Sequence, residues 1–205
     1  MTIRLHRGDL PDLARYRSGT VAIDTETMGL EPRRDRLCVV QLSPGDGSAD
    51  VVQMPPGRAS APNLAKLLAD ANILKLFHFA RFDLGVLYQT LGVMAGPVYC
   101  TKIASRLART YTDRHGLKDL VKELLGIDLS KQQQLSDWGA AELSEAQIAY
   151  AASDVMHLHA LRAKLDAILV REGRAELANA CFRFLPDRVR LDLSGWAAED
   201  IFSHS

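Results

Sequence analysis

Two acidic residues follow a short apolar run in "VAIDTETMGL", residues 21–30. The first three residues, Val21 to Ile23, have the composition of a strand that enters a core. Asp24 and Glu26 are two positions apart, so on a strand their side chains point to the same face. Two carboxylates held side by side repel each other at neutral pH. They are therefore either solvated at the end of the strand or neutralised by a bound cation.

Two further acids lie in apolar surroundings later in the chain. Asp83 lies between Phe82 and Leu84 in "HFARFDLGVL", early in a predicted helix. Asp154, in "YAASDV", comes four residues after Tyr150, so both side chains occupy one face of a helix. A helix dipole can favour an acid near its N-terminus, and a lone acid on an amphipathic helix is ordinary. The apolar neighbours nevertheless predict partial burial, which is costly for an unpaired carboxylate and implies a nearby cation.

Together the four acids have the chemistry of a site for hard metal ions. No histidine or cysteine cluster converges with them in the sequence, and oxygen-only ligands favour Mg²⁺ or Mn²⁺. Two such ions roughly 3.5–4 Å apart are a known arrangement for phosphoryl hydrolysis. The predicted metal ligands are Asp24, Glu26, Asp83 and Asp154.

Three segments resemble the exonuclease motifs of the DEDD superfamily: "IDTET", "HFARFDLGVL" and "YAASDV". The spacing of Tyr150 and Asp154 is similar to that of its tyrosine branch, which includes ribonuclease D. "DRLCVVQLS", "SKQQQLSDW" and the ending "GWAAEDIFSHS" resemble the compact nanoRNase C group of that branch. The resemblance implies an α/β, ribonuclease H-like fold with a mixed central sheet flanked by helices. It also implies two divalent metals, 3′-to-5′ hydrolysis that releases 5′-mononucleotides, and a ring-shaped homo-octamer.

The same resemblance implies a role for each motif residue. Asp24 would bridge both metals, and Glu26 and Asp154 would complete the first metal's site. Asp83 would support the second metal, which would stabilise the leaving 3′ oxygen. Tyr150 would orient the attacking water, so these five residues form the predicted catalytic set.

Three residues near the motifs are predicted to contact substrate. Leu30 either wedges between the last two bases or packs within its own loop. His78 either contacts the sugar or the scissile phosphate, or it is a structural histidine. Thr25, between the two acids of the strand, is also predicted to contact substrate.

Basic residues gather in "RTYTDRHGLK" and "SKQQQ". They can bind a terminal 5′ phosphate through charge-assisted hydrogen bonds, or they form a solvated basic face. The predicted set is Arg109, Arg114, His115, Lys118 and Lys131. Trp138, in "SDW", is assigned to the core rather than to base stacking.

Strands are expected to precede most of the helices. Three β-branched runs, "VAIDTE", "LCVVQLS" and "ADVVQM", are separated by turn residues, which predicts an antiparallel meander. "ILKLFHF" predicts a further strand, and "ARFDLGVLYQTLG" predicts a helix that ends at a left-handed Gly92. Ser144 and Gln147 form a predicted capping box, and the helix that follows is expected to continue to about Arg171. Such a pattern is typical of α/β or α+β layered folds.

The 205 residues are enough for one domain with a sizeable core. Residues 1–205 are predicted to form a single exonuclease domain, with the motifs within about 20–170. A helix and tail over 174–205 carry aromatic and aliphatic residues, which either form a contact between copies of the chain or fold back onto the chain's own core; the contact between copies is the prediction. The C-terminal HRDC domains of full ribonuclease D are not expected.

Charge and cysteine content indicate the cellular environment in which the protein is expected to act. The 25 basic and 25 acidic residues give a formal net charge of zero, so composition offers no electrostatic argument for nucleic acid. The three cysteines, an odd number without close pairs, predict a reducing compartment. We find neither a signal peptide nor a membrane-spanning apolar run in the sequence, and therefore expect a cytoplasmic protein without membrane attachment.

The leading functional hypothesis is an exoribonuclease that degrades short single-stranded RNA down to and including dinucleotides. The motifs equally allow a broader ribonuclease D-like enzyme acting on tRNA-like RNA or DNA, because the metal chemistry is the same. A hypothesis of another class is an inactive exonuclease fold used as a binding module. The presence of all five catalytic residues argues against it.

Overall fold

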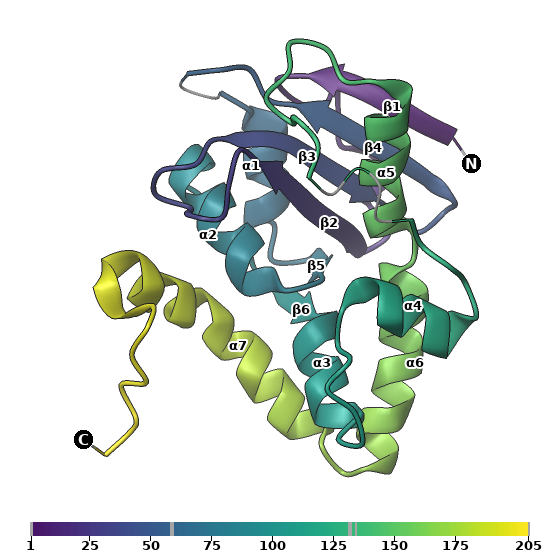
Figure 1. The fold of residues 1–205 in the computed structure, drawn as a ribbon, viewed down its shortest axis with the longest axis vertical. Coiled ribbons are helices and arrows are strands. Elements are labelled where there is room, and N and C mark those ends of the chain that lie inside the picture. Colours follow the sequence, from purple (N-terminus) through teal and green to yellow (C-terminus); the bar gives the residue numbers. More distant parts are fainter. Residues whose placement is uncertain (1, 58–59, 131–132, 134, 205) are drawn as a thin grey trace.

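The centre of the molecule is a six-stranded sheet with the order β1-β4-β3-β2-β5-β6 (Figure 1). The structure is a computed structural model and describes residues 2–57, 60–130, 133 and 135–204. The strands are β1 (Thr2–Arg7), β2 (Thr20–Thr27), β3 (Leu37–Ser43), β4 (Ser48–Gln53), β5 (Leu74–Phe77) and β6 (Val98–Cys100). β3 pairs antiparallel with both of its neighbours, and the other pairs are parallel. The sheet is therefore mixed, as predicted.

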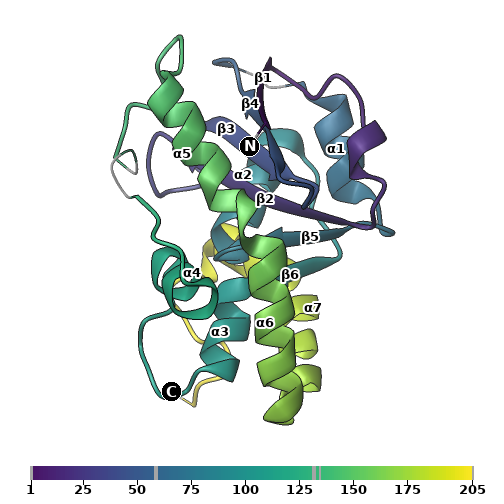
Figure 2. The same ribbon diagram turned by 90° about the vertical axis from the view of Figure 1, so that its right-hand side faces the viewer.

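Helices lie on both faces of the sheet and below its β6 edge. They are α1 (Pro62–Ala69), α2 (Ala80–Leu91), α3 (Thr101–Ala108), α4 (Leu117–Leu125), α5 (Glu145–Met156), α6 (Leu158–Arg171) and α7 (Ala175–Leu191). Figure 2 shows α5 and α1 on opposite sides of the sheet. α5 crosses β2, β3 and β4, whereas α3, α6 and α7 pack together beside β6.

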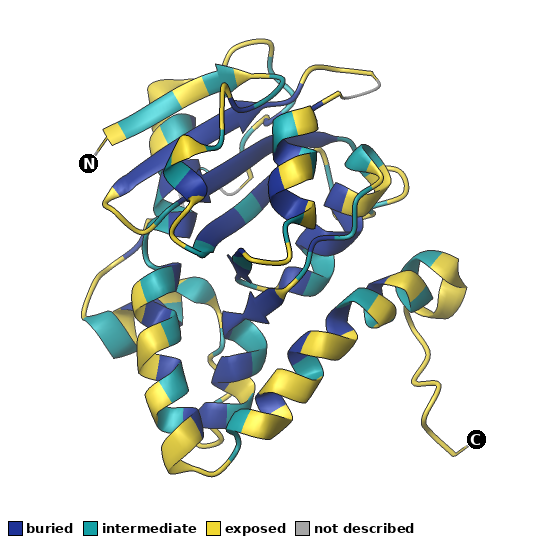
Figure 3. Cartoon of the chain, turned by 180° about the vertical axis from the view of Figure 1, so that it is seen from behind, coloured by how far each residue is buried: buried dark blue, intermediate teal, exposed yellow. Residues whose placement is uncertain are grey.

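The core is continuous from the sheet into these helices. β3 and β4 are buried at every position, as expected for central strands that are covered on both faces. Figure 3 shows the central strands as buried and the edge strand β1 as largely accessible. Burying the central strands fixes the register of β2, and with it the positions of Asp24 and Glu26.

Several local predictions are confirmed. β2, β3 and β4 form the antiparallel meander. α2 ends at Gly92, which has a φ of 71° in the left-handed region. Ser144 and Gln147 form the capping box at the start of α5, with both reciprocal hydrogen bonds present. The three cysteines are free thiols.

The long helix predicted from Ser144 to about Arg171 is instead two helices, which is a correction. The break lies at His157, between α5 and α6. α5 packs on the sheet, whereas α6 packs on α3, α4 and α7. The change of direction lets each helix bury an apolar face against a different layer. No glycine or proline marks the break, so the sequence pattern gave no indication of it.

β1 is an element that the sequence pattern did not predict. It pairs with β4, and a buried carboxylate helps to hold it there: Asp50 accepts hydrogen bonds from His6 at 2.9 Å and from Tyr16 at 2.6 Å. The partners are more than 30 residues apart, so this stabilisation arises only in the folded chain.

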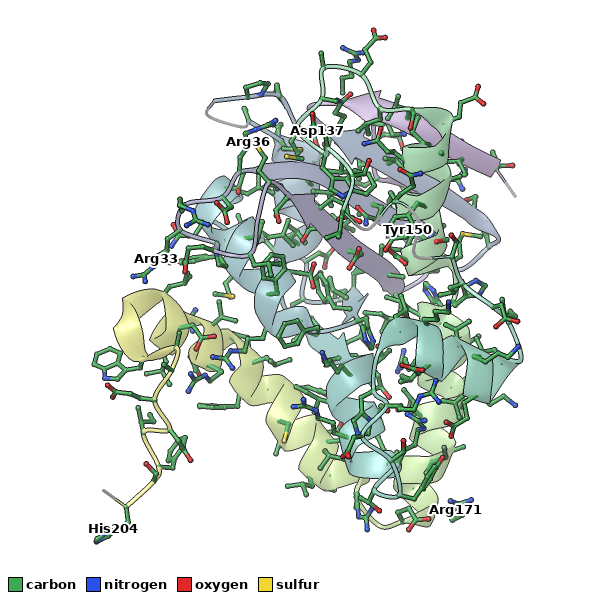
Figure 4. All side chains as sticks on the ribbon, in the orientation of Figure 1. Arg33, Arg36, Asp137, Tyr150, Arg171 and His204 are labelled. Atoms are coloured by element: carbon green, nitrogen blue, oxygen red, sulfur yellow. The ribbon has the colours of Figure 1, made fainter. Side chains whose placement is uncertain are left out.

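The C-terminal region consists of α7, a π-helical turn over Asp192–Trp196, and an extended end. Phe182, Leu185 and Val189 are buried against the rest of the protein. Figure 4 shows His204 at the far end of the tail, away from the sheet. Among the described residues, none of the helices has both the length and the apolar character that a membrane span requires.

Candidate active site

The predicted metal ligands on β2 and α5 come together where α5 crosses the sheet. Asp24, Glu26 and Asp154 each offer a carboxylate oxygen, and these oxygens lie within 4.8 Å of one another. Asp24 and Glu26 share one face of β2 because side chains alternate along a strand. Tyr150 lies on the same face of α5 as Asp154, beside β2 (Figure 4). The structure thus brings together four of the five predicted catalytic side chains.

Asp83 joins this cluster from α2, on the opposite side of β2. Its carboxylate is buried and accepts a hydrogen bond of 2.7 Å from the Thr25 hydroxyl. Thr25 lies between the two strand acids, so its side chain points to the face on which α2 packs. The Thr25 hydroxyl therefore positions Asp83, and a contact of Thr25 with substrate stays a prediction.

The electrostatics of the cluster require positive charge. Burial raises the pKa of Asp24 well above its usual range, and the charges of Asp83, Asp154 and Glu26 raise it further. Burial, with the charges of Asp154 and Asp83, likewise raises the pKa of Glu26 to about 9. Burial also raises the pKa values of Asp83 and Asp154. Because hard cations would offset this repulsion, the donor set fits divalent ions such as Mg²⁺.

Gln41 is a site residue that the sequence reasoning missed. It lies on β3 directly opposite Asp24 in the antiparallel register. Its Nε2 donates a hydrogen bond of 2.6 Å to Asp24 Oδ2, and the side chain is fully buried. A glutamine inside the apolar run "LCVVQLS" was the available indication, because a buried amide needs a polar partner. Gln41 fixes the orientation of the Asp24 carboxylate.

Tyr150 is held in place by its ring and remains protonated. The ring lies 6.0 Å from that of Trp138, with an interplanar angle of 41°. Trp138 is buried, which confirms its assignment to the core. Burial and the charges of Asp154, Glu26 and Asp24 raise the pKa of Tyr150 above its usual value. The hydroxyl is therefore a proton donor beside the carboxylates.

His78 follows β5 and points to Thr101 at the start of α3. Thr101 Oγ1 lies 3.2 Å from the carbonyl oxygen of Phe77, to which it donates, and 2.9 Å from His78 Nδ1. With the hydroxyl proton assigned to the Phe77 carbonyl, the proton of the neutral ring is assigned to Nδ1, which makes Nε2 an acceptor. Burial and the charge of Lys102 lower the pKa of His78 to about 3. An uncharged acceptor suits a sugar hydroxyl rather than a phosphate.

Leu30 lies in the loop after β2 and is 86% exposed. The side chain is thus not packed within its own loop, which was the alternative to a wedge between bases. Met28, in the same loop, is exposed as well. The wedge itself stays a prediction.

The basic cluster is only partly available for a phosphate. Arg109 is fully buried, forms an ion pair with Glu123, and donates to the carbonyl oxygen of Arg114 at 2.8 Å. It also follows the last residue of α3, roughly 12 Å along that helix from the sheet edge, at 1.5 Å per residue. The prediction that Arg109 binds substrate is therefore corrected to a structural role.

The other members of that cluster have mixed surroundings. Arg114 is exposed and paired with Asp119, and His115 Nδ1 lies 2.8 Å from Ser105 Oγ. Lys118 is exposed on α4, and Lys131 lies outside the described residues. Of the described members, Arg114 and Lys118 are thus the ones accessible to a ligand.

Comparison with known proteins agrees with this site. A family model described as 3′-5′ exonuclease matches residues 12–170. The ribonuclease D of Gluconacetobacter diazotrophicus is 38% identical over 167 residues, which are 82% of this chain and 42% of that protein. The chain thus spans less than half the length of the ribonuclease D relatives that it matches.

Two solved structures match over their full length, and a third over less than half of its chain. Brucella melitensis NrnC with bound Mg²⁺ has a TM-score of 0.96 and 61% identity, with full coverage of both chains. Brucella melitensis NrnC bound to pGG has a TM-score of 0.97 and 62% identity, again with full coverage. Escherichia coli RNase D has a TM-score of 0.76 and 26% identity over 86% of this chain and 46% of that chain.

Similarity to 3′-5′ exonucleases accounts for both the fold and the acidic residues. The mixed sheet flanked by helices matches the DEDD exonuclease fold of these structures. The family model covers both acids of β2, Asp83 on α2, and the tyrosine and aspartate of α5. The chain belongs to the 3′-5′ exonuclease family, as a hydrolase of the ribonuclease D-like type that includes NrnC.

Proposed function

We propose that the protein degrades short oligoribonucleotides from the 3′ end, down to and including dinucleotides, and releases 5′-mononucleotides. The observation that carries this proposal is the full-length similarity, at 62% identity, to a NrnC that was solved bound to pGG. The carboxylate cluster supports it, because Asp24, Glu26 and Asp154 lie close enough to share cations.

The chemistry rests on two divalent cations, Mg²⁺ or Mn²⁺. Asp24, Glu26, Asp83 and Asp154 would hold them, since their oxygens are the ligands that these ions prefer. When bound, the cations would lower the pKa of water and stabilise the charge that develops on the phosphate and the leaving oxygen. Under this proposal, EDTA should abolish turnover because it removes the cations.

The remaining steps belong to side chains of the protein. Gln41 holds the Asp24 carboxylate, and Thr25 holds that of Asp83. The Tyr150 hydroxyl forms a hydrogen bond with the attacking water and so fixes the direction of attack. His78 Nε2 accepts a hydrogen bond from a sugar hydroxyl, which helps to position the 3′-terminal nucleotide.

Replacing Tyr150 with phenylalanine tests the water-orienting role. The ring and its contact with Trp138 remain, so we expect the melting temperature to stay within about 2 °C of the wild-type value. Loss of the hydroxyl should lower kcat by about 10-fold or more, within the range for positioned proton and water contacts. KM should change little, as measured by steady-state release of mononucleotides. An unaltered kcat would show that the hydroxyl has no catalytic role.

A broader ribonuclease D-like activity is the second candidate, because the ribonuclease D relatives share 38% identity with this chain. The two candidates are separated by turnover of a dinucleotide, a 7-mer RNA and a duplex DNA, measured side by side with Mg²⁺. We expect kcat/KM for the dinucleotide to exceed that for the 7-mer by about 10-fold, or about 1.4 kcal/mol of transition-state binding.

The matched control for this measurement is Asp154→Asn, which should be inactive on all three substrates. Equal rates on the 7-mer and the dinucleotide would favour the broader ribonuclease D-like activity. Rapid hydrolysis of the duplex would show that DNA is also a substrate. Metal-dependent release of mononucleotides from any of them would exclude an inactive binding module.

We further propose that copies of the chain assemble through the C-terminal tail, as a homo-octamer. Phe184, Trp196, Ile201 and Phe202 are large apolar residues with substantial exposure, and they lie within one short region. Contiguous exposed apolar surface of this kind is typical of interfaces between proteins. The cytoplasmic location stays a prediction.

A further inference from the structure

Phe79 has a backbone conformation that its side chain does not favour. Its φ of 71° and ψ of 44° place it in the left-handed region, at the residue before α2. Among the described residues, it is the one non-glycine position with a positive φ. Glycine or asparagine would adopt this conformation at a lower cost in free energy than a bulky residue. The backbone therefore gives no reason for phenylalanine at this position.

The fold makes little use of the aromatic ring either. Phe79 is 45% exposed, and its side chain does not cap α2. The backbone carbonyl, which any residue would supply, accepts the hydrogen bond from Phe82. The ring forms a cation–π contact with Lys102, whose Nζ lies 4.4 Å from the ring centroid. Strain that the fold does not use is a reason to look for a functional role.

The location of Phe79 connects it to the metal site. β2, β5 and β6 run parallel, so their carboxyl ends lie at one edge of the sheet. Two residues beyond the last registered pair of β2 and β5 are Asp24 and His78. Just beyond the ends of β5 and β6 are Phe79, before α2, and Lys102, in the first turn of α3, and their side chains are in contact. Phe79 also directly precedes α2, whose first turn carries Asp83 about 6 Å further along the helix axis, so the ring lies close to the carboxylate cluster.

We propose that the Phe79 ring stacks on a nucleobase of the bound oligonucleotide, with the Lys102 ammonium moving from the ring to an adjacent backbone phosphate. The inference rests on the proposed function, because it requires an oligonucleotide at the carboxylate cluster. Stacking on an aromatic side chain accepts any base, which suits an enzyme without sequence preference. Lysine has a flexible stem and a compact charge, so it can exchange the ring for a phosphate. The left-handed turn directs the ring toward the edge of the sheet and fixes it there before substrate binds.

Replacing Phe79 with asparagine separates this role from a structural one. Asparagine tolerates the left-handed conformation, so the melting temperature should stay equal to that of the wild type or rise. Without the ring, KM for a dinucleotide should rise about 10-fold, within the range for loss of one stacked base. kcat should change by less than about 2-fold, because no group at the carboxylates is altered. Phe79→Trp, which keeps an aromatic face, should retain most of the wild-type affinity.

The decisive measurement is a double-mutant-type cycle in which the Phe79 ring, a base of the substrate, or both are removed. Dinucleotides with one abasic ribose, at either position, are compared on the wild type and on Phe79→Asn. If Phe79 stacks on a base, removing that base should abolish the effect of the substitution. The control is Tyr111→Asn. Tyr111 has an exposed ring with a similar cation partner, Arg109, at 5.7 Å, and it follows the C-terminal end of α3, whereas Lys102 lies at the start of that helix. It should leave KM unchanged.

Three results would overturn the inference. The first is an unchanged KM in Phe79→Asn, and the second is a KM effect that persists on both abasic substrates. A change in oligomeric mass of the variant would assign Phe79 to an interface instead, which also contradicts base stacking. If the wild type turns over 7-mers but no dinucleotide, the proposed substrate length fails. The same cycle run on 7-mers with 3′-terminal abasic units then still tests Phe79 by itself.

Discussion

Replacing Asp24 with asparagine is expected to lower exonuclease turnover by about 10³-fold or more while the protein stays folded. Asp24 lies among the other acids, and burial, together with the charges of all three, raises its pKa. Losing it would remove a ligand shared by both proposed cations, a larger change than the roughly 10- to 100-fold effect of losing an outer-shell partner. Asparagine keeps the shape of the side chain and can still hydrogen-bond Gln41.

A thermal unfolding experiment tests the same residue without relying on activity. In EDTA, Asp24→Asn should melt at a temperature equal to or above that of the wild type, because it removes one charge from a buried cluster of like charges. Mg²⁺ should raise the melting temperature of the wild type through preferential binding to the folded state, and should raise that of the variant much less. Asp128→Asn, which alters an exposed carboxylate paired with Lys122, is the control and should respond to Mg²⁺ as the wild type does. Substantial turnover by folded wild-type protein in EDTA would refute the metal site.

Local patterns were sufficient to predict the elements that carry the acids. The β-branched runs around Asp24 predicted the meander, because strands buried on both faces need continuous apolar residues. The capping box at Ser144 predicted the start of α5, because it depends on residues three positions apart. Elements whose formation depends on residues far apart in the sequence were either missed or predicted incorrectly. β1 depends on the buried carboxylate of Asp50, and the break at His157 depends on two separate packing layers.

In the candidate site, the sequence was sufficient to predict the metal ligands but not the residue that orients one of them. Carboxylates in apolar segments were recognisable, because unpaired buried charge is rare and requires a cation. Gln41 was missed because its partner, Asp24, is 17 residues away and is reached only through the pairing of β2 and β3. Arg109 was assigned to phosphate because it lies in a basic segment. In the fold it pairs with Glu123, which no spacing rule predicted.

The tail offers a second prediction with a large effect. Val189 is buried, and Asp192 accepts a hydrogen bond of 2.7 Å from Arg81 on α2 and forms an ion pair, also at 2.7 Å, with Arg188 on α7. Arg81 is two residues before Asp83, so the tail is attached to the helix that carries a predicted metal ligand. The last residues have different surroundings: Phe202 is 75% exposed, and its ring is 6.0 Å from that of Phe184. The hydrogen bonds that Arg188 donates to the tail end at Glu199, and the exposed Phe202 is available to another copy of the chain.

Two truncations should separate these contributions. A chain that ends at Pro186 loses Val189 and Asp192, and burial of a valine alone contributes about 1.5–3 kcal/mol. Since typical stabilities are about 5–15 kcal/mol, we expect this chain to melt well below the wild type or to fail to fold. A chain that ends at Ala197 keeps Asp192 and two of the hydrogen bonds from Arg188, and should melt as the wild type does but lose its assembly. Light scattering decides the point, because the wild type should have a multiple of the 22.6 kDa chain mass and the Ala197 truncation a lower one. A wild-type mass near 22.6 kDa at micromolar concentration would refute the proposed assembly, since no second copy would then cover Phe202.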